Sequence, residues 1–145
     1  MTPRRLILAA PALLLLPPEP ARASAEAMAA ALRAFTGGAA VTAGRVALDI
    51  SPLVENGNTV PLSVMVQSPM TQAEHIRAIA VFNERNPQPH VVTARFSRHS
   101  GQAMLATNIR LATSQTILAV AAFSDGSFWS DSAQVIVTLA ACLEG

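Results

Sequence analysis

The stretch Thr59–Val66, which reads TVPLSVMV, decides the fold. Every even-numbered position from 60 to 66 is valine or leucine, whereas Pro61, Ser63 and Met65 stand between them. Strict alternation over this length is typical of a β-strand with one buried face. Because proline has no N–H to donate to a sheet, we expect Pro61 at a sheet edge or at the start of a strand.

Six further runs with strand-like composition lie on either side of this segment. They are Arg45–Ile50, His75–Phe82, Val91–Phe96, Gln102–Ile109, Thr116–Phe123 and Phe128–Leu139. Turn-forming residues separate most of them, among them Glu55–Asn58 and Asn86–Pro89, and Asp125-Gly126 between the last two runs predicts a β-hairpin. About seven short strands at this spacing predict an all-β fold, an immunoglobulin-like antiparallel β-sandwich.

Two segments are rich in residues that also suit a helix. Glu26–Phe35 (EAMAAALRAF) consists mostly of helix formers and is followed by Gly37-Gly38, so we expect a short N-terminal helix there. Thr71–Val81 (TQAEHIRAIAV) has a helical alternative, but its β-branched residues and the Asn86-Pro87 pair beyond it favour a strand.

The last run predicts which side chains face the core. Positions 135, 137 and 139 are expected to point inward, and positions 134, 136 and 138 outward. Apolar residues also fall on the parity that we expect to be outward, at Ile79, Val81 and Ile136. We therefore expect the N-terminal helix or a partner protein to cover this surface.

Residues 1–25 have the pattern of an export signal. Arg4-Arg5 precede the apolar run Leu6–Leu16, and small residues follow, with cleavage expected before Ser24 or Glu26. The arginine pair resembles a twin-arginine signal. The apolar run is shorter than the roughly 20 residues that a membrane span needs. We therefore predict a signal peptide over 1–25, a domain over 26–139 and a C-terminal arm over 140–145, in a periplasmic protein.

Cys142 is the single cysteine of the chain, so it has no intramolecular disulfide partner. By the alternation of the last strand it points away from the core. Glu144 beside it disfavours the thiolate, and no basic residue follows Arg110. A single thiol that is accessible and not activated by its surroundings suits a carrier whose covalent cargo is handled by other proteins. The alternative is a cysteine that carries nothing, in an immunoglobulin-like assembly module.

Three segments and the terminal cysteine resemble the SoxY family of periplasmic sulfur-oxidation carriers. The segments are VENGNTVPLSVMVQSPMT (54–71), NPQPHVVTARF (86–96) and TNIRLATSQTILAVAAFSDGSFW (107–129). The resemblance implies an immunoglobulin-like sandwich paired in a heterodimer with SoxZ, a second β-sandwich subunit. It also implies that Cys142 carries sulfur intermediates of thiosulfate oxidation. The transient partners that it implies are a c-type cytochrome, a sulfate-releasing hydrolase and a sulfane dehydrogenase.

The arm differs from the family pattern Gly-Gly-Cys-Gly-Gly. Here Ala140, Ala141, Leu143, Glu144 and Gly145 surround the cysteine. Alanine and leucine restrict the backbone more than glycine does. The resemblance therefore leaves open a divergent SoxY-like protein with another cargo or another set of partners.

Other kinds of site find little support in the sequence. His75, His90 and His99 lack metal-ligand spacing, and no cofactor is predicted. No acid, base and nucleophile converge, so we predict a carrier rather than an enzyme. All ten basic residues are arginines without a basic block, which argues against nucleic acid as a partner. Phe128 and Trp129 follow the predicted hairpin turn and are candidate contacts of a partner subunit.

Overall fold

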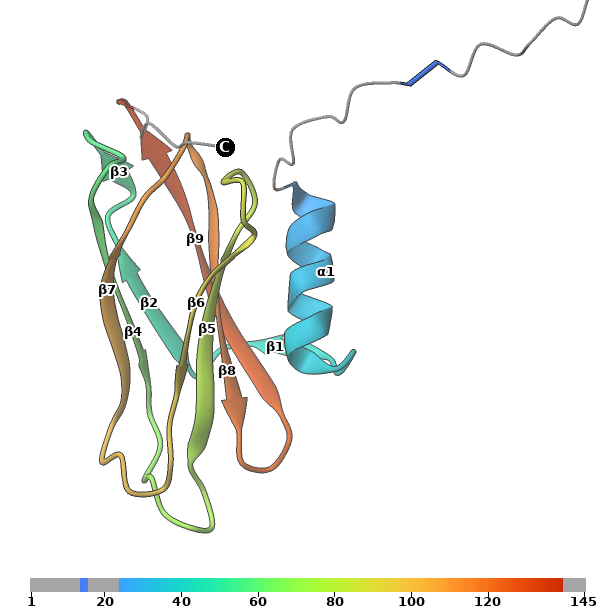
Figure 1. Ribbon diagram of the computed structural model, residues 1–145. Helices are drawn as coiled ribbons and strands as arrows, with labels where there is room; N and C mark the ends of the chain where they lie inside the picture. Colours follow the sequence, from blue (N-terminus) through green and yellow to red (C-terminus); the bar gives the residue numbers. More distant parts are fainter. Residues whose placement is uncertain (1–13, 16–23, 140–145) are drawn as a thin grey trace, which may run out of the picture.

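The computed structural model describes residues 14–15 and 24–139 of the chain (Figure 1). This part contains one helix, α1 (Ala25–Thr36), followed by nine strands. The strands are β1 (Val41–Ala43), β2 (Val46–Ile50), β3 (Leu53–Val54), β4 (Val60–Val66), β5 (Ile76–Asn83), β6 (His90–Arg95), β7 (Ala103–Ile109), β8 (Gln115–Phe123) and β9 (Phe128–Val137). Figure 1 shows the strands in two layers, with α1 beside one of them.

The strands form two sheets. The larger has the order β1-β9-β8-β5-β6, with β3 also pairing with β9, and the smaller has the order β2-β4-β7. The seven longer strands pair antiparallel, whereas the short β1 and β3 each lie parallel to β9. The predicted immunoglobulin-like β-sandwich is confirmed. The two short strands were not predicted, because segments of two or three residues are too short to show alternation.

Strand β4 is buried on the face that its alternating sequence predicts. The four apolar side chains at positions 60, 62, 64 and 66 of β4 are each at most 3% exposed. Pro61 lies at the start of β4, as expected, although β4 is the central strand of its sheet. The register with β2 ends at Ile50 opposite Leu62, so Pro61 pairs only with Asn108 of β7.

Strand β5 is buried on both faces. Ile79 and Val81 are fully buried in the core between the sheets, so the prediction that they face outward is wrong. The other face of β5 carries Ala78, Ala80 and Phe82, which pack beneath the helix. The segment is nearly all apolar, and without alternation the parity of its faces cannot be read from the sequence.

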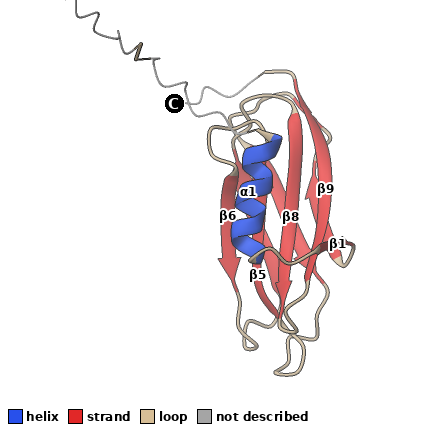
Figure 2. Ribbon diagram, turned by 90° about the vertical axis from the view of Figure 1, so that its right-hand side faces the viewer, coloured by secondary structure: helices blue, strands red, loops and turns tan. Residues whose placement is uncertain are grey.

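Helix α1 covers the outer face of the larger sheet (Figure 2). The Ser24 hydroxyl accepts a hydrogen bond from Ala27 N at 3.1 Å and caps its first turn, and Gly37 ends it at φ +66°. The Phe35 ring lies edge-on to the rings of Phe82 and Phe128, at 5.9 and 5.8 Å. Burying a side chain of this size contributes about 1.5–3 kcal/mol. The predicted N-terminal helix is confirmed, one residue longer at each end.

The end of β9 differs from the prediction. Val135 is 1% exposed and faces the core, and Ile136 is 59% exposed, both as expected. Leu139 was expected to face the core, but its side chain is 61% exposed. The strand ends at Val137, so the alternation does not extend to Leu139.

Candidate functional site

The backbone of the last described residues is held at one end of the sandwich. Thr138 N donates to Val54 O at 3.0 Å, and Gly57 N donates to Leu139 O at 2.8 Å. The chain is therefore hydrogen-bonded up to Leu139, three residues before Cys142 in the sequence. We call this end of the sandwich the arm end.

Gly57 connects the strand end to the loop after β7. Its N–H binds Leu139 O, and its own carbonyl accepts from Leu111 N at 2.9 Å. Leu111 is fully buried, so the loop that positions Gly57 is itself anchored in the core. Asn58 N donates to Asn56 Oδ1 at 2.9 Å, which forms the predicted turn.

A network of side-chain amides holds the loops beside this strand end. Asn86 Oδ1 accepts from Ala112 N at 2.9 Å and from Gln115 Nε2 at 2.8 Å. Asn86 Nδ2 donates to Arg110 O, at 2.6 Å. Asn86 N in turn donates to Asn83 Oδ1 at 2.9 Å. The network ties the loop between β5 and β6 to the loop between β7 and β8.

A hollow of about 480 Å³ lies between the edge strands β6 and β7 at the arm end. Asn83, His90, Asn108 and Arg110 are among its lining residues, and none of the lining residues is acidic. We call it the β6–β7 hollow. Figure 1 shows the loop between β5 and β6 and the loop between β7 and β8 at the same end of the sandwich. An arginine without a carboxylate beside it makes this hollow suited to an anion.

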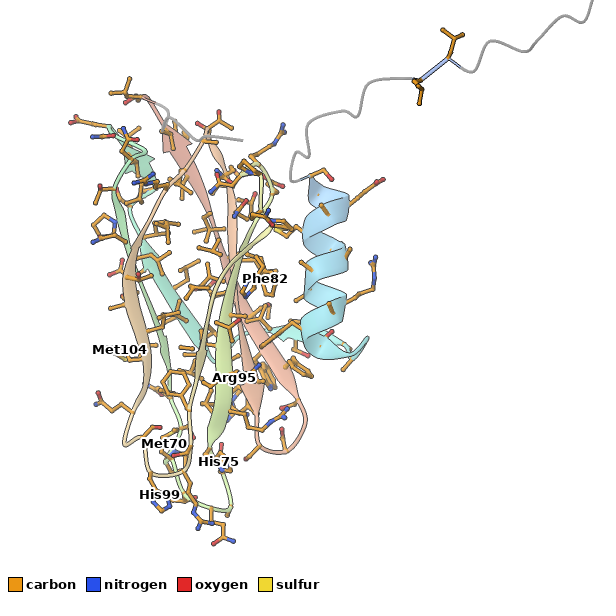
Figure 3. All side chains as sticks on the ribbon, in the orientation of Figure 1. Met70, His75, Phe82, Arg95, His99 and Met104 are labelled. Carbon is orange, nitrogen blue, oxygen red and sulfur yellow. The ribbon has the colours of Figure 1, made fainter. Side chains whose placement is uncertain are left out.

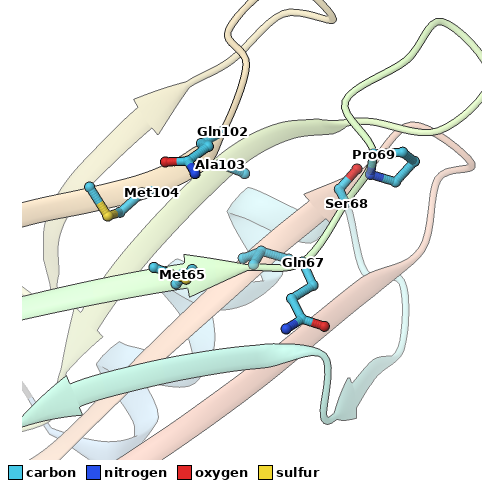
Figure 4. Close-up of a pocket in the computed structure, with 8 residues that line it drawn as sticks. Met65, Gln67, Ser68, Pro69, Gln102, Ala103 and Met104 are labelled. Atoms are coloured by element: carbon cyan, nitrogen blue, oxygen red, sulfur yellow. The ribbon is translucent and has the colours of Figure 1, made fainter.

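A second hollow, of about 440 Å³, lies at the opposite ends of β4 and β7 (Figure 4). Met65 and Met104, register partners on the two strands, line it with Gln67 and Gln102. The two methionines are 50% and 46% exposed. No charged side chain lines this second hollow.

The end of the sandwich opposite the arm end is closed by an arginine and aromatic rings. The Arg45 guanidinium carbon lies 4.0 Å from the centroid of the Phe123 ring and 5.4 Å from that of Trp129. Arg45 Nη2 also binds Glu74 Oε1 at 2.7 Å. Arg45 has φ +61°, a backbone conformation that a non-glycine residue rarely adopts and that these contacts support. We call this cluster the Arg45 cluster.

The hairpin between β8 and β9 carries Asp125. Its carboxylate accepts from Ser127 Oγ at 2.6 Å and from Ser127 N at 2.9 Å. These two bonds, chiefly the one from the hydroxyl, and the charge of Arg45 lower the pKa of Asp125. Gly126 has φ +86°, which confirms the turn expected from the Asp-Gly pair.

The structure places the two predicted partner contacts beside this hairpin. Phe128 is 8% exposed and lies beneath α1, so a partner could reach it only if the helix moved. Trp129 is half-buried, and its Nε1 donates to Ser127 Oγ at 3.2 Å. Because its ring is only partly covered, Trp129 stays a predicted contact of a partner subunit.

Each of the three histidines interacts with a different residue, and within the described residues none of them interacts with another histidine. His75 Nδ1 is 2.9 Å from Thr71 O, and His90 Nε2 is 2.6 Å from Thr93 Oγ1. His99 accepts from Arg98 Nε, and Figure 3 shows it at the same end as His75. The part of the chain that the structure describes contains no group of three His, Cys, Asp or Glu side chains that could hold a metal ion.

Cys142 and the other predicted arm residues lie outside the described residues. These are Ala140, Ala141, Leu143, Glu144 and Gly145. The described residues that act on the arm end, Gly57, Asn86 and Arg110, were not predicted as a group. The Asn-Gly and Asn-Pro dipeptides indicated turns, but nothing in the sequence indicated which strand end the turns would contact. Within residues 14–15 and 24–139, no helix has the length and apolarity to cross a membrane.

Solved structures with a similar fold include a sulfur carrier. The sulfur carrier protein SoxY from Chlorobium limicola f thiosulfatophilum matches with a TM-score of 0.67 and 21% identity, over 80% of this chain and 100% of that one. A superoxide reductase (neelaredoxin) from Ignicoccus hospitalis has a TM-score of 0.58 and 15% identity, over 65% and 80% of the two chains. The superoxide reductase from Nanoarchaeum equitans has a TM-score of 0.55 and 11% identity, over 66% of this chain and 100% of that one. At these identities the matches show a shared fold.

The comparison of the sequence with protein families favours the sulfur carrier over the superoxide reductases. No match was found among curated proteins. The family described as "Sulfur oxidation protein SoxY" matches residues 32–142, which include all nine strands and end at Cys142. The chain therefore belongs to the SoxY family of sulfur oxidation proteins.

Proposed function

We propose that this protein carries sulfur intermediates covalently on Cys142 during thiosulfate oxidation in the periplasm, together with a SoxZ-like subunit. The observation that carries the proposal is the backbone hydrogen bond from Gly57 to Leu139, two residues after the end of β9, with the single cysteine of the sequence three residues further along the chain. A thiol on a short segment after a fixed strand end can enter the cleft of another protein while the sandwich stays outside. The family match, which ends at Cys142, supports this assignment.

The partner enzymes catalyse the reactions, and the carrier provides only the thiol. In the loading step, the Cys142 thiol gives up its proton and its sulfur bonds to the outer sulfur of thiosulfate, forming Cys–S–S–SO₃⁻. Two electrons leave in this step, and a c-type cytochrome accepts them. A hydrolase then adds water and releases sulfate, and a sulfane dehydrogenase oxidises the sulfur that remains. Since no basic residue follows Arg110 in the sequence to favour the thiolate, the partner enzymes supply the activation.

The SoxZ-like subunit needs a surface on this chain. The outer face of the smaller sheet carries Met65 and Met104 directly opposite each other, both about half exposed. Exposed apolar side chains that adjoin on a sheet favour contact with another protein. Trp129 is the second candidate contact, at the same end of the sandwich.

The experiment is intact-protein mass spectrometry of the reduced protein after incubation with thiosulfate and its oxidising cytochrome system. We expect the mass of one S–SO₃ group to be added, and we expect no addition in Cys142→Ser. Urea unfolding of the two proteins should coincide, since only one atom beyond the described sandwich is changed. An adduct that persists in the serine variant, or no adduct in either protein, would contradict the proposal.

A further inference from the structure

We propose that the β6–β7 hollow binds the arm, residues 140–145, when Cys142 carries a sulfonate group, and that Arg110 contacts the sulfonate. This inference rests on the proposed function for the identity of the natural cargo. The site would hold the loaded arm against its own sandwich between visits to partner enzymes. Its ligand class is an alkyl disulfane sulfonate, R–S–S–SO₃⁻, an anion with three equivalent oxygens.

The charges of the hollow fit such an anion. Arg110 and Asn108, which are both exposed, line the hollow, whereas His90 Nε2 is already 2.6 Å from Thr93 Oγ1. The described residues include no ion-pair partner for Arg110. The guanidinium presents its N–H donors in a planar fork that matches two oxygens of an oxyanion. The arm itself contains Glu144 and no basic residue, so it adds negative charge and no competing cation.

The backbone of Arg110 is fixed on both sides. Its carbonyl accepts from Asn86 Nδ2, and the next residue, Leu111, is fully buried and hydrogen-bonded to Gly57. The side chain therefore extends from a rigid position, so less conformational entropy is lost when it binds. Asn86 is itself held in place, because its backbone N–H donates to Asn83 Oδ1 and its side-chain oxygen accepts from Gln115, which is 5% exposed.

The arm is long enough to reach this place. Leu139 is hydrogen-bonded to Gly57, and Gly57 to Leu111, so two steps of strand spacing, about 10 Å, separate the start of the arm from the backbone beside Arg110. The three residues from Leu139 to Cys142 span up to about 10 Å when extended. The cysteine side chain and the S–SO₃ group extend the reach further.

The contact depends on the stage of the cargo. The S–SO₃⁻ group offers sulfonate oxygens to Arg110, whereas the sulfur that remains after sulfate release has none. We therefore expect the arm to dissociate from the hollow once sulfate has left. The sandwich would in this way distinguish an arm that still carries its sulfonate from one that has lost it.

The test loads Cys142 without any enzyme. Tetrathionate reacts with the thiolate at one of its central sulfurs, giving Cys–S–S–SO₃⁻ and releasing thiosulfate. Methyl methanethiosulfonate gives the neutral Cys–S–S–CH₃ and releases methanesulfinate. The rate at which dithiothreitol removes each group is then followed by mass spectrometry in the wild type, in Arg110→Gln and in the matched control Arg98→Gln. Arg98 is also exposed but lies in the loop at the opposite end.

We expect Arg110→Gln to release the sulfonate group about three- to tenfold faster than the wild type, as loss of one hydrogen bond of typical net strength at an exposed site predicts. The methyl group should leave all three proteins at one rate, and Arg98→Gln should match the wild type for both groups. Equal sulfonate release from wild type and Arg110→Gln would overturn the docking site. It would leave the proposed function standing if thiosulfate still loads Cys142 enzymatically.

Two further measurements distinguish a failure of the docking site from a failure of the proposed function. Coincident thermal unfolding of wild type and Arg110→Gln shows that the substitution has left the fold intact, because the hydrogen bond at this position uses the backbone carbonyl of residue 110. Arg110-dependent protection without enzymatic loading would contradict the proposed function alone. Acceleration of methyl release in Arg110→Gln would show that the arginine acts on the reductant or the thiol rather than on the sulfonate, and would also overturn the inference.

Discussion

The two ends of this sandwich are closed by different physical means. At the arm end, the amides of Asn86 and Gln115 satisfy backbone groups of the surrounding loops. At the opposite end, Arg45 lies over the ring of Phe123 and pairs with Glu74. Directional hydrogen bonds fix the relative positions of the loop groups that they join, whereas burying aromatic rings chiefly raises the free energy of unfolding.

The difference indicates how the molecule divides its tasks. The strand end before the arm is positioned by the hydrogen bonds of Gly57, and the loops beside it by the amide network. Among the described residues, no buried side-chain N or O lacks a hydrogen-bond partner. A satisfied network of this kind favours one arrangement of the loops over others. We therefore expect changes at the Arg45 cluster to alter stability and changes at the arm end to alter both stability and arm chemistry.

The largest effect is expected from Phe123→Ala. The Phe123 side chain is 1% exposed, and removing it leaves a cavity and takes the ring from beneath Arg45. Such truncations cost about 3–5 kcal/mol of unfolding free energy. Urea unfolding measures the loss, and the rate at which a maleimide labels Cys142 under native conditions should stay unchanged.

Phe123→Leu is the matched variant for this position. It retains an apolar side chain but loses the cation–π contact with Arg45, so we expect a loss of about 1–2 kcal/mol. If either variant changed the labelling rate of Cys142 while the protein remained folded, the two ends would be coupled, and the division of tasks would be wrong.

A smaller effect is expected from Asn86→Ala at the arm end. The substitution leaves Ala112 N, Gln115 Nε2 and Arg110 O without the partner that Asn86 provides. Leaving such groups unsatisfied costs about 1–3 kcal/mol. We expect this loss in urea unfolding, together with faster amide hydrogen exchange over residues 84–90 and 110–115.

Asn108→Ala provides the control, since Asn108 is exposed and its side chain makes no hydrogen bond to the described residues. Its unfolding free energy should stay within about 0.5 kcal/mol of the wild type. Asn86→Ala with the stability and exchange of the control would show that the loops at the arm end are held by other contacts.

The sequence predicted the sandwich well where periodicity is strict. Strand β4 alternates without exception, and its buried face was assigned correctly. In β5 both faces are apolar, because one lies against the other sheet and one beneath α1. No alternation remains in such a strand, and the facing of Ile79 and Val81 was therefore predicted wrongly. Leu139 was misassigned because β9 ends before it.

The candidate site was only partly predictable, for a related reason. Cys142 stands out in a sequence with a single cysteine. The residues of the arm end, by contrast, come from loops far apart in the chain, and their roles depend on tertiary contacts. Asn86 bonds to Arg110 across 24 positions and to Gln115 across 29. A turn dipeptide predicts local backbone shape and gives no indication of the distant groups that its side chain will bind.

The smallest effect is expected from Asp125→Asn, which keeps an oxygen for the Ser127 bonds but removes the charge near Arg45. Since the pKa of Asp125 in the folded protein lies below its ordinary value of 3.8, its carboxylate stabilises the fold above that pH, and the contribution is lost as pH falls through the folded pKa. We therefore expect the asparagine variant to lose less unfolding free energy than the wild type between neutral pH and about pH 3. Asp49→Asn, at an exposed position of β2, is the control. If Asp125→Asn and the wild type had the same pH dependence, the bonds from Ser127 would not favour the charged form, and the hairpin would be held by its backbone alone.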